Sequence, residues 1–275
     1  MTVADGICEV YRKDFVLNGD EVNKYIKKIN IGFVKELIFL DETTSTFDET
    51  YRLKCRNGGV VCTKRQTAGR GRLGRKWESD KGGVYFSVLI SAKNRAENLS
   101  AITAICAAAV KTALGKYTKC AIKWPNDIVS ADGKKLCGIL TKLKTEGNEI
   151  SSLDIGIGIN VNNESFSDKL KYGTSLKIIL ENYVNENKLL AEVLEQTGIF
   201  LNKKTEEAMR IYAQACINVG RAVRALSPDG KEIYRGICAG INPDATLKLK
   251  TEDGKEMNVC SGEFSVRGIY GENYV

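Results

Sequence analysis

Residues 60–77 read VVCTKRQTAGRGRLGRKW, and this stretch decides how the rest of the chain is interpreted. Its middle, residues 64–76, carries three glycines and six basic side chains and no carboxylate. Such a segment buries little apolar surface and its like charges repel, so by itself it is expected to be mobile until an anion orders it. Apolar, β-branched runs flank it, which predicts a long loop between two strands. Because glycine permits close backbone approach and arginine binds phosphate or carboxylate oxygens in pairs, this basic loop is a candidate anion site. The alternative is a solvated loop without a function.

The composition limits the class of protein. A length of 275 residues allows one large domain or two of moderate size. The formal net charge of +7 indicates anionic partners, without the dense basic patterning of a dedicated nucleic-acid binder. The N-terminal residues show no apolar core behind a positive end, and no apolar run reaches membrane-spanning length. We therefore expect a cytoplasmic protein that binds neither a membrane nor nucleic acid.

Cysteine and histidine usage narrows the chemistry further. Nine cysteines are scattered without a CxxC pair, which is typical of reduced thiols in a cytosolic protein and predicts no zinc site. The chain contains no histidine. Catalytic triads that use histidine, the usual imidazole base and most transition-metal sites are thereby excluded. Any chemistry must use lysine, arginine, carboxylates, backbone dipoles or a hard cation.

Periodicity and capping residues predict the order of the elements. Helices are expected near 20–28, from the hydroxyl cluster at 43–46 to about 56, and at 99–114, 174–182 and 187–215. Strands are expected at 37–40, 60–63 and 84–90, up to Lys123, at 135–143 and up to Asn160. From Gly220 onward the period changes to two between hairpin turns, which predicts a small antiparallel barrel. Residues 1–35 are too short and too weakly patterned for a winged helix-turn-helix domain.

Three further features are candidate ligand contacts, and each has a structural alternative. The sequence KWPND at 123–127 gathers a lysine, an indole, an amide and a carboxylate around one bend, although Pro-Asn-Asp is also an ordinary turn. The hydroxyls at 43–46 cap a helix, and the spare ones can bond a ligand. Gly156 and Gly158 leave room for a flat ligand or serve tight strand packing, and Asn160 after them suits the edge of a purine.

Four motifs together resemble the biotin protein ligases (biotin–acetyl-CoA-carboxylase ligases), over about residues 37–268. These motifs are GRGRLGRKW at 69–77, KWPND at 123–127, KLCGIL at 135–140 and GIGIN at 156–160. The resemblance implies an α+β fold with a mixed-sheet catalytic domain of the class II synthetase and biotin/lipoate ligase type, followed by a small SH3-like C-terminal β barrel. It also implies an N-terminal extension (1–35), a biotin- and ATP-binding catalytic domain (36–217) and the C-terminal β domain (218–275).

The same resemblance implies roles for individual residues. Biotin is expected to bind at Ser45, Thr46, Gln66, Arg70, Gly71, Arg72, Lys135 and Gly138. ATP and the adenylate are expected at Arg70, Arg72, Arg75, Trp77, Lys123, Asn126 and Asn160. Lys135, Arg72 and Asp127 are the implied catalytic residues, and metal ligands are not assigned. Phe47 departs from the family, many members of which have a polar residue there.

The implied activity is ATP-dependent activation of biotin as biotinyl-5'-AMP, followed by transfer to one lysine of a biotin carboxyl carrier protein. ATP and Mg²⁺ would be required, and the enzyme would be a monomer or a homodimer without an N-terminal DNA-binding domain. This chemistry needs no histidine, because a carboxylate is already ionised and the step requires positioning and charge neutralisation. The alternatives are a lipoate or octanoate transferase on the same scaffold, a bifunctional ligase and repressor, and a nucleic-acid-binding module.

Overall fold

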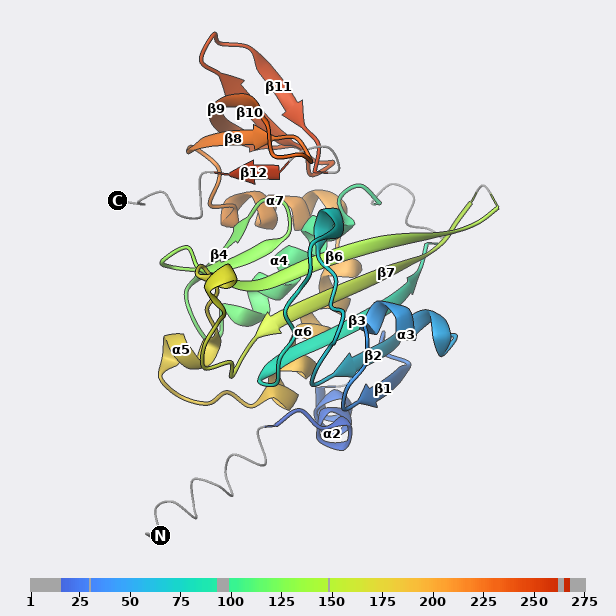
Figure 1. Ribbon diagram of the computed structural model, residues 1–275. Coiled ribbons are helices and arrows are strands. Elements are labelled where there is room, and N and C mark those ends of the chain that lie inside the picture. Colours follow the sequence, from blue (N-terminus) through green and yellow to red (C-terminus); the bar gives the residue numbers. More distant parts are fainter. Residues whose placement is uncertain (1–15, 30, 93–98, 148, 262–264, 268–275) are drawn as a thin grey trace.

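The computed structural model describes residues 16–29, 31–92, 99–147, 149–261 and 265–267, and it contains two sheets (Figure 1). The larger is a seven-stranded mixed sheet of order β1-β2-β3-β7-β6-β5-β4. Its strands are β1 (Glu36–Leu40), β2 (Gly59–Thr63), β3 (Gly83–Ser91), β4 (Cys120–Lys123), β5 (Asp127–Ser130), β6 (Lys135–Glu146) and β7 (Glu149–Asn160). Only the β1–β2 pair is parallel among the described pairs, so the predicted mixed sheet is confirmed.

The two faces of this sheet have different neighbours. On one face lie α4 (Ile102–Leu114), α6 (Glu186–Leu201) and α7 (Thr205–Ala215), which pack with the strands into the main core. On the other face lie α3 (Thr46–Arg52) and the basic loop, drawn in front of the sheet in Figure 1. The residues of strand β7 explain why the two faces differ. Its isoleucines at 155, 157 and 159 are buried in the core, and Gly156 and Gly158 alternate with them on the opposite face.

Several helix boundaries differ from the prediction. The helix expected to reach residue 56 ends at Arg52, where Leu53 caps it and Lys54 takes a positive φ of 51°. The single helix expected at 187–215 is two helices, because Asn202 caps α6 and donates its side-chain amide to Gly198 O before α7 begins. Helix α5 (Leu176–Leu180) is shorter than expected, since Glu181 is left-handed.

The smaller sheet is antiparallel, of order β11-β10-β9-β8-β12, and forms the predicted C-terminal β structure. Its strands are β8 (Ala222–Leu226), β9 (Glu232–Ile241), β10 (Leu247–Thr251), β11 (Glu256–Val259) and β12 (Ser265–Arg267). It is joined to the KWPND bend, because Trp124 donates its indole N–H to Ala245 O at 2.9 Å and its backbone N–H to Asn218 Oδ1 at 2.8 Å. The C-terminal sheet thereby fixes one wall of the bend.

The N-terminal region is tied to the main sheet's helices. Helix α2 (Gly19–Ile29) is confirmed close to its predicted place and packs on α6. Leu17 is fully buried, and its backbone N–H donates to Glu186 at 2.8 Å. Residues 1–15 of the expected extension lie outside the described residues, and the division into three domains stays a prediction.

None of the helices in the described ranges has both the length and the apolar character needed to cross a bilayer. The eight described cysteines are all free thiols, as expected for a reduced protein.

Candidate active site

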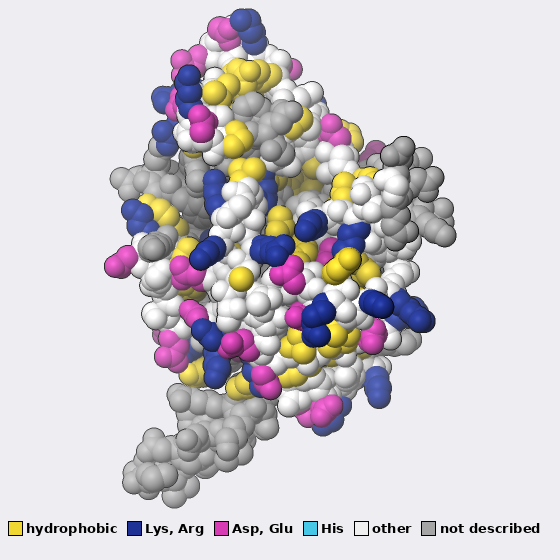
Figure 2. Space-filling model, turned by 45° about the vertical axis from the view of Figure 1, so that its right-hand side comes forward, with side chains coloured by type: hydrophobic (Ala, Val, Ile, Leu, Met, Phe, Trp, Pro, Cys, Tyr) yellow, Lys and Arg dark blue, Asp and Glu magenta, His cyan; other side chains and the backbone are white. Residues whose placement is uncertain are grey.

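A cavity of about 370 Å³ opens on the face of the main sheet that carries the basic loop. In Figure 2, lysine and arginine side chains gather across the middle of this face, beneath the C-terminal sheet. The cavity brings together thirteen of the fourteen residues singled out in the sequence: Thr46, Gln66, Arg70, Gly71, Arg72, Arg75, Trp77, Lys123, Asn126, Asp127, Lys135, Gly138 and Asn160. The exception is Ser45, which is fully buried at the start of α3 and does not line the cavity.

The basic loop folds back on itself over the cavity. Trp77 N donates to Gly69 O at 2.9 Å and Gly71 N donates to Arg75 O at 2.7 Å, so the loop is a narrow hairpin. Its tip is a 3₁₀ turn over Arg72–Gly74. Gly69 is required there, because a Cβ would lie 2.4 Å from Trp77 O.

Three of the six basic side chains of the loop pair with carboxylates that lie elsewhere in the chain. Lys64 pairs with Asp41 at 2.8 Å, Arg65 with Glu42 at 2.6 Å and Arg70 with Asp48 at 2.7 Å. All three carboxylates are supplied by residues 41–48, so the loop is held electrostatically to the segment that begins α3. The pairs are partly exposed, so water and salt screen them.

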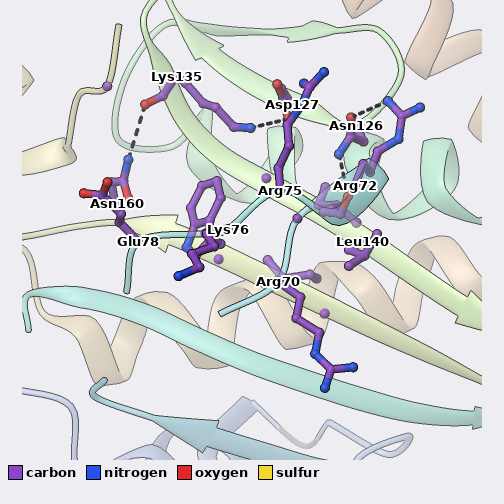
Figure 3. A pocket seen from close by; sticks show the side chains of 18 of the residues that line it. Arg70, Arg72, Arg75, Lys76, Glu78, Asn126, Asp127, Lys135, Leu140 and Asn160 are labelled. Carbon is purple, nitrogen blue, oxygen red and sulfur yellow. Dashed lines mark hydrogen bonds and ion pairs between the residues drawn. The ribbon is translucent and has the colours of Figure 1, made fainter. Parts of the chain in front are cut away.

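One end of the cavity, the cationic end, collects charged side chains around the KWPND bend (Figure 3). Lys135 Nζ lies 2.8 Å from Asp127 Oδ1 and 5.0 Å from the centre of the Trp77 ring. Arg72 donates to Asn126 Oδ1 at 3.3 Å and also to the backbone oxygen of Ser261, which precedes β12. Burial lowers the pKa of Arg72, and the nearby charge of Asp127 opposes that change. Figure 3 shows Arg75 pointing toward Asp127 and Arg70 pointing away from it.

Trp77 forms part of the cavity wall over two glycines. A Cβ at Gly138 would lie 2.7 Å from the indole, and a Cβ at Gly158 would lie 2.5 Å from Trp77 Nε1. Gly156 is covered in the same way by the Phe47 ring, at 2.3 Å. The two glycines of β7 therefore make room for the aromatic side chains of Phe47 and Trp77, and both glycines also line the cavity. The sequence had suggested a flat ligand or tight strand packing, and these aromatic neighbours were not predicted. Trp77 Nε1 is buried without a hydrogen-bond partner among the described residues and lies at the cavity wall.

The opposite end, the neutral end, is built by Thr46, Phe47 and Gln66. Gln66 Oε1 accepts from Thr46 N at 2.9 Å and from Thr46 Oγ1 at 3.2 Å, while Gln66 Nε2 donates to Ser79 Oγ at 2.8 Å. These bonds fix the amide group, so its orientation is set by the protein before any ligand arrives. Hydrogen bonds, without formal charges, dominate this end.

The asparagine amides also serve structural bonds. Asn126 Nδ2 donates to Ile139 O at 2.7 Å, and Asn160 Nδ2 donates to Thr174 O at 3.0 Å and to Lys135 O at 3.3 Å. Asn160 therefore ties the end of β7 to the start of β6. A contact from Asn160 to a purine would have to come from its carbonyl oxygen.

The sequence did not point to the residues that close the cavity beside Lys135. Phe166, Leu170, Tyr172 and Gly173 line it, and Lys135 N donates to Tyr172 O at 2.6 Å. Val266 of β12 lines it from the C-terminal sheet. Residues 162–173 are mostly polar and have no helix or strand periodicity. The only feature of this segment that could have indicated a place in the cavity wall is its two aromatic residues.

The chemistry available in the cavity is charge neutralisation and positioning. The described residues contain no group of three or more histidine, cysteine, aspartate and glutamate side chains that could hold a metal ion. The described lining residues include no cysteine, serine or histidine, the usual covalent nucleophiles or bases. Cations beside an indole and a hydrogen-bonding neutral end suit a ligand that is anionic at one end and neutral at the other.

Comparison with known proteins identifies relatives across most of the chain. Residues 37–160 match the model of the biotin/lipoate A/B protein ligase family. The bifunctional ligase/repressor BirA of Bacillus spizizenii is 32% identical over 262 residues, covering 88% of this chain and 77% of that protein. The biotin–acetyl-CoA-carboxylase ligase of Paracoccus denitrificans is 32% identical over 128 residues, covering 44% of this chain and 53% of that protein.

A solved structure shares the architecture. The biotin protein ligase of Aquifex aeolicus, determined in complex with biotin and ATP, superimposes with a TM-score of 0.75 at 33% identity. The match covers 85% of this chain and 99% of that one. The α+β fold with its small C-terminal β domain is thus common to both chains.

Proposed function

Because the chain belongs to the biotin protein ligases of the biotin/lipoate A/B protein ligase family, we propose that it activates biotin with ATP and transfers the biotinyl group to a lysine of a biotin carboxyl carrier protein. The observation that carries this proposal is a single cavity with a cationic end and a neutral end, built from the four sequence motifs. The uncharged ureido ring of biotin suits the neutral end. The carboxylate and the phosphates suit the cationic end.

In the first step, a biotin carboxylate oxygen attacks the α-phosphorus of ATP, the bond to pyrophosphate breaks, and biotinyl-5'-AMP forms. The developing negative charge would be met by Lys135, Arg72 and Arg75. Such groups catalyse by being held in place before charge develops, and this step needs no proton transfer from the protein.

Magnesium would accompany ATP on its phosphate oxygens. Magnesium in such sites keeps several waters and is bound by one or two carboxylates together with substrate phosphates. Two carboxylates line the cavity among the described residues, Asp127 and Glu78, and either could contribute a ligand. The ion would supply charge neutralisation of the phosphates.

In the second step, the lysine amine of the carrier attacks the acyl carbon and AMP leaves. Asp127 would orient the amine and accept its proton, since its carboxylate lies at the bend beside Lys135. Asp127→Asn should therefore slow transfer from preformed biotinyl-5'-AMP about a hundredfold, a typical contribution of a general base. Transfer at the wild-type rate, measured in a single turnover, would rule out this role.

The test of the whole proposal is incubation with biotin, ATP, magnesium and a biotin carrier domain, read by the mass of the carrier. We expect a mass gain of one biotinyl group, no gain on a carrier whose acceptor lysine is arginine, and no gain when lipoate replaces biotin. Labelling with lipoate instead would favour the lipoate ligases of the same family. We expect the enzyme to act in the cytoplasm as a monomer or homodimer.

A further inference from the structure

Asp154 is a buried carboxyl group that the proposed mechanism does not use. It lies on β7, paired with Leu89 of β3 and Lys142 of β6, and it is 1% exposed. It alternates with the isoleucines of β7 and therefore faces α3, two residues before the Gly156 that Phe47 covers. The carboxyl thus sits behind the neutral end of the cavity.

The Thr50 hydroxyl lies between two oxygen atoms. Thr50 Oγ1 lies 2.8 Å from Phe47 O and also within hydrogen-bond distance of Asp154 Oδ2. A hydroxyl has one proton, and a carbonyl and a carboxylate are both acceptors. Both contacts can be hydrogen bonds only if Asp154 carries a proton, so that Asp154 donates to Thr50 and Thr50 donates to Phe47 O.

We propose that Asp154 is a positioning residue, and that its neutral acid, through Thr50, holds α3 in the arrangement that binds ligand. Loss of the proton to water leaves the carboxylate as an acceptor, and the Thr50 hydroxyl then turns toward it. Phe47 O loses that hydrogen bond. Phe47 lines the cavity and Thr46 bonds Gln66, so the change reaches the neutral end directly.

The groups around Asp154 determine the pH at which it loses its proton. Burial is the largest influence and raises the pKa of Asp154 to about 6. The charges of Lys144, 3.9 Å away, and of Lys142 on β6 oppose that rise, as does the hydrogen bond that Thr50 donates once the carboxylate is ionised, whereas Asp48 on α3 adds to it. Burial raises the pKa of Cys55, which follows α3, and the charge of Asp154 raises it further.

The composition makes this titration easy to observe. The chain has no histidine, so the usual side chain that titrates near neutrality is missing. Burial also raises the pKa of one other described carboxyl group, that of Glu186 at the start of α6. Glu186 accepts hydrogen bonds from Leu17 N and from the side-chain amide of Asn162, which follows β7. Glu186 therefore provides a matched control: a buried carboxyl without a contact to α3.

This inference rests on the proposed function in one respect, namely that biotin occupies the neutral end. Calorimetry with biotin should show affinity about tenfold weaker near pH 8 than near pH 5 in the wild type, the size expected for one unit of linked pKa change. Asp154→Asn, whose amide can donate to Thr50, should bind biotin with the same affinity at both pH values. Glu186→Gln should keep the wild-type dependence. The inference is overturned if Asp154→Asn retains the pH dependence or if Glu186→Gln abolishes it.

A second measurement needs no ligand. Carbon-13 NMR of labelled aspartate carboxyls should show one resonance titrating near pH 6 that disappears in Asp154→Asn and stays in Glu186→Gln. Absence of such a resonance overturns the inference even if biotin binds. If biotin gives no heat with the wild type at any pH while the resonance is present, the proposed function fails and the assignment of the neutral acid stands.

Discussion

The side chains at the two ends of the cavity are held in place by different kinds of interaction. At the cationic end, side chains of opposite charge neutralise each other across elements, as Lys135 and Asp127 do, and these side chains are 30% and 16% exposed. At the neutral end, Thr46 and Gln66 are fixed by directed hydrogen bonds, and a fully buried carboxyl lies behind them. From this difference we infer that charge would serve the proposed reaction and that directed hydrogen bonds would serve ligand affinity. Changes at the cationic end should therefore affect rates, and changes at the neutral end should affect binding and stability.

The largest expected effect is a loss of reaction rate from a substitution at the cationic end. Lys135→Met should slow formation of biotinyl-5'-AMP by about 10²–10³-fold, because a preorganised cation is lost where phosphate charge develops. Single-turnover release of pyrophosphate measures it. Lys134→Met is the matched control, since Lys134 pairs with Asp132 in an exposed turn and should leave the rate unchanged. If Lys135→Met weakened biotin affinity more than it slowed the reaction, the assignment of rate to the cationic end and of affinity to the neutral end would be wrong.

The next effect concerns stability and belongs to the neutral end. The pKa of Asp154 is raised from 3.8 to about 6 in the folded protein, so the folded state binds this proton more tightly than the unfolded chain. Stability from this group is complete below about pH 4 and is lost as pH rises toward 6, a change of about 3 kcal/mol. Asp154→Asn should therefore be more stable than the wild type near pH 8, by up to about 3 kcal/mol.

Urea unfolding at several pH values measures this difference. Below about pH 3 the two proteins should have nearly equal free energies of unfolding, because Asp154 is then mostly neutral in both the folded and the unfolded state. Thr50→Val serves as a further comparison, since it removes the hydroxyl between Asp154 and Phe47. A constant difference between Asp154→Asn and the wild type across the whole pH range would contradict a titrating carboxyl at this position.

The sequence predicted the cationic end better than the neutral end, for a physical reason. Asp127 begins β5 and Lys135 begins β6, and these two strands form a short antiparallel pair in which Val129 is in register with Lys135. Because β5 has only four residues, local pairing keeps Lys135 within reach of Asp127. The neutral end depends on contacts between distant segments: Thr50 and Asp154 are 104 residues apart, and Arg70 and Asp48 are 22 apart. Periodicity placed Asp154 in a strand, but nothing local indicated that its carboxyl group would be buried against α3. Ser45 was expected in the cavity from the family resemblance, and nothing local indicated that its side chain would be fully buried at the start of α3.

A smaller effect should come from the amide that links α3 to the basic loop. Gln66→Leu removes the acceptor of Thr46 N and the donor to Ser79. Leaving a buried donor unpaired costs about 1–3 kcal/mol, so biotin affinity should fall about tenfold. The rate of transfer from preformed adenylate should change little. Thr67→Val, at the next and exposed position, is the control in the same calorimetric titration. A fall in the transfer rate equal to the fall in affinity would show that the two ends are not separable.

The smallest effect tests the ion pair that joins the basic loop to the neutral end. Arg70 donates to both carboxylate oxygens of Asp48 at 2.7 Å, and both side chains are nearly half exposed. An exposed pair contributes about 0.2–1 kcal/mol, so Asp48→Asn should raise the rate of proteolytic cutting within 70–75 by about fivefold or less. The increase should vanish near 1 M salt, where screening acts within about 3 Å.

Biotin should slow cutting in the wild type and in Asp48→Asn alike, because a bound anion adds contacts to the same arginines and shields the loop. Glu21→Gln on α2 removes an exposed pair with Lys24 far from the loop, and it should leave cutting within 70–75 unchanged. Equal cutting with and without biotin in the wild type would show that the loop does not close on the ligand. An Asp48→Asn effect that persists at high salt would show that Asp48 holds the loop by a directed hydrogen bond, as the neutral end does, and not by charge.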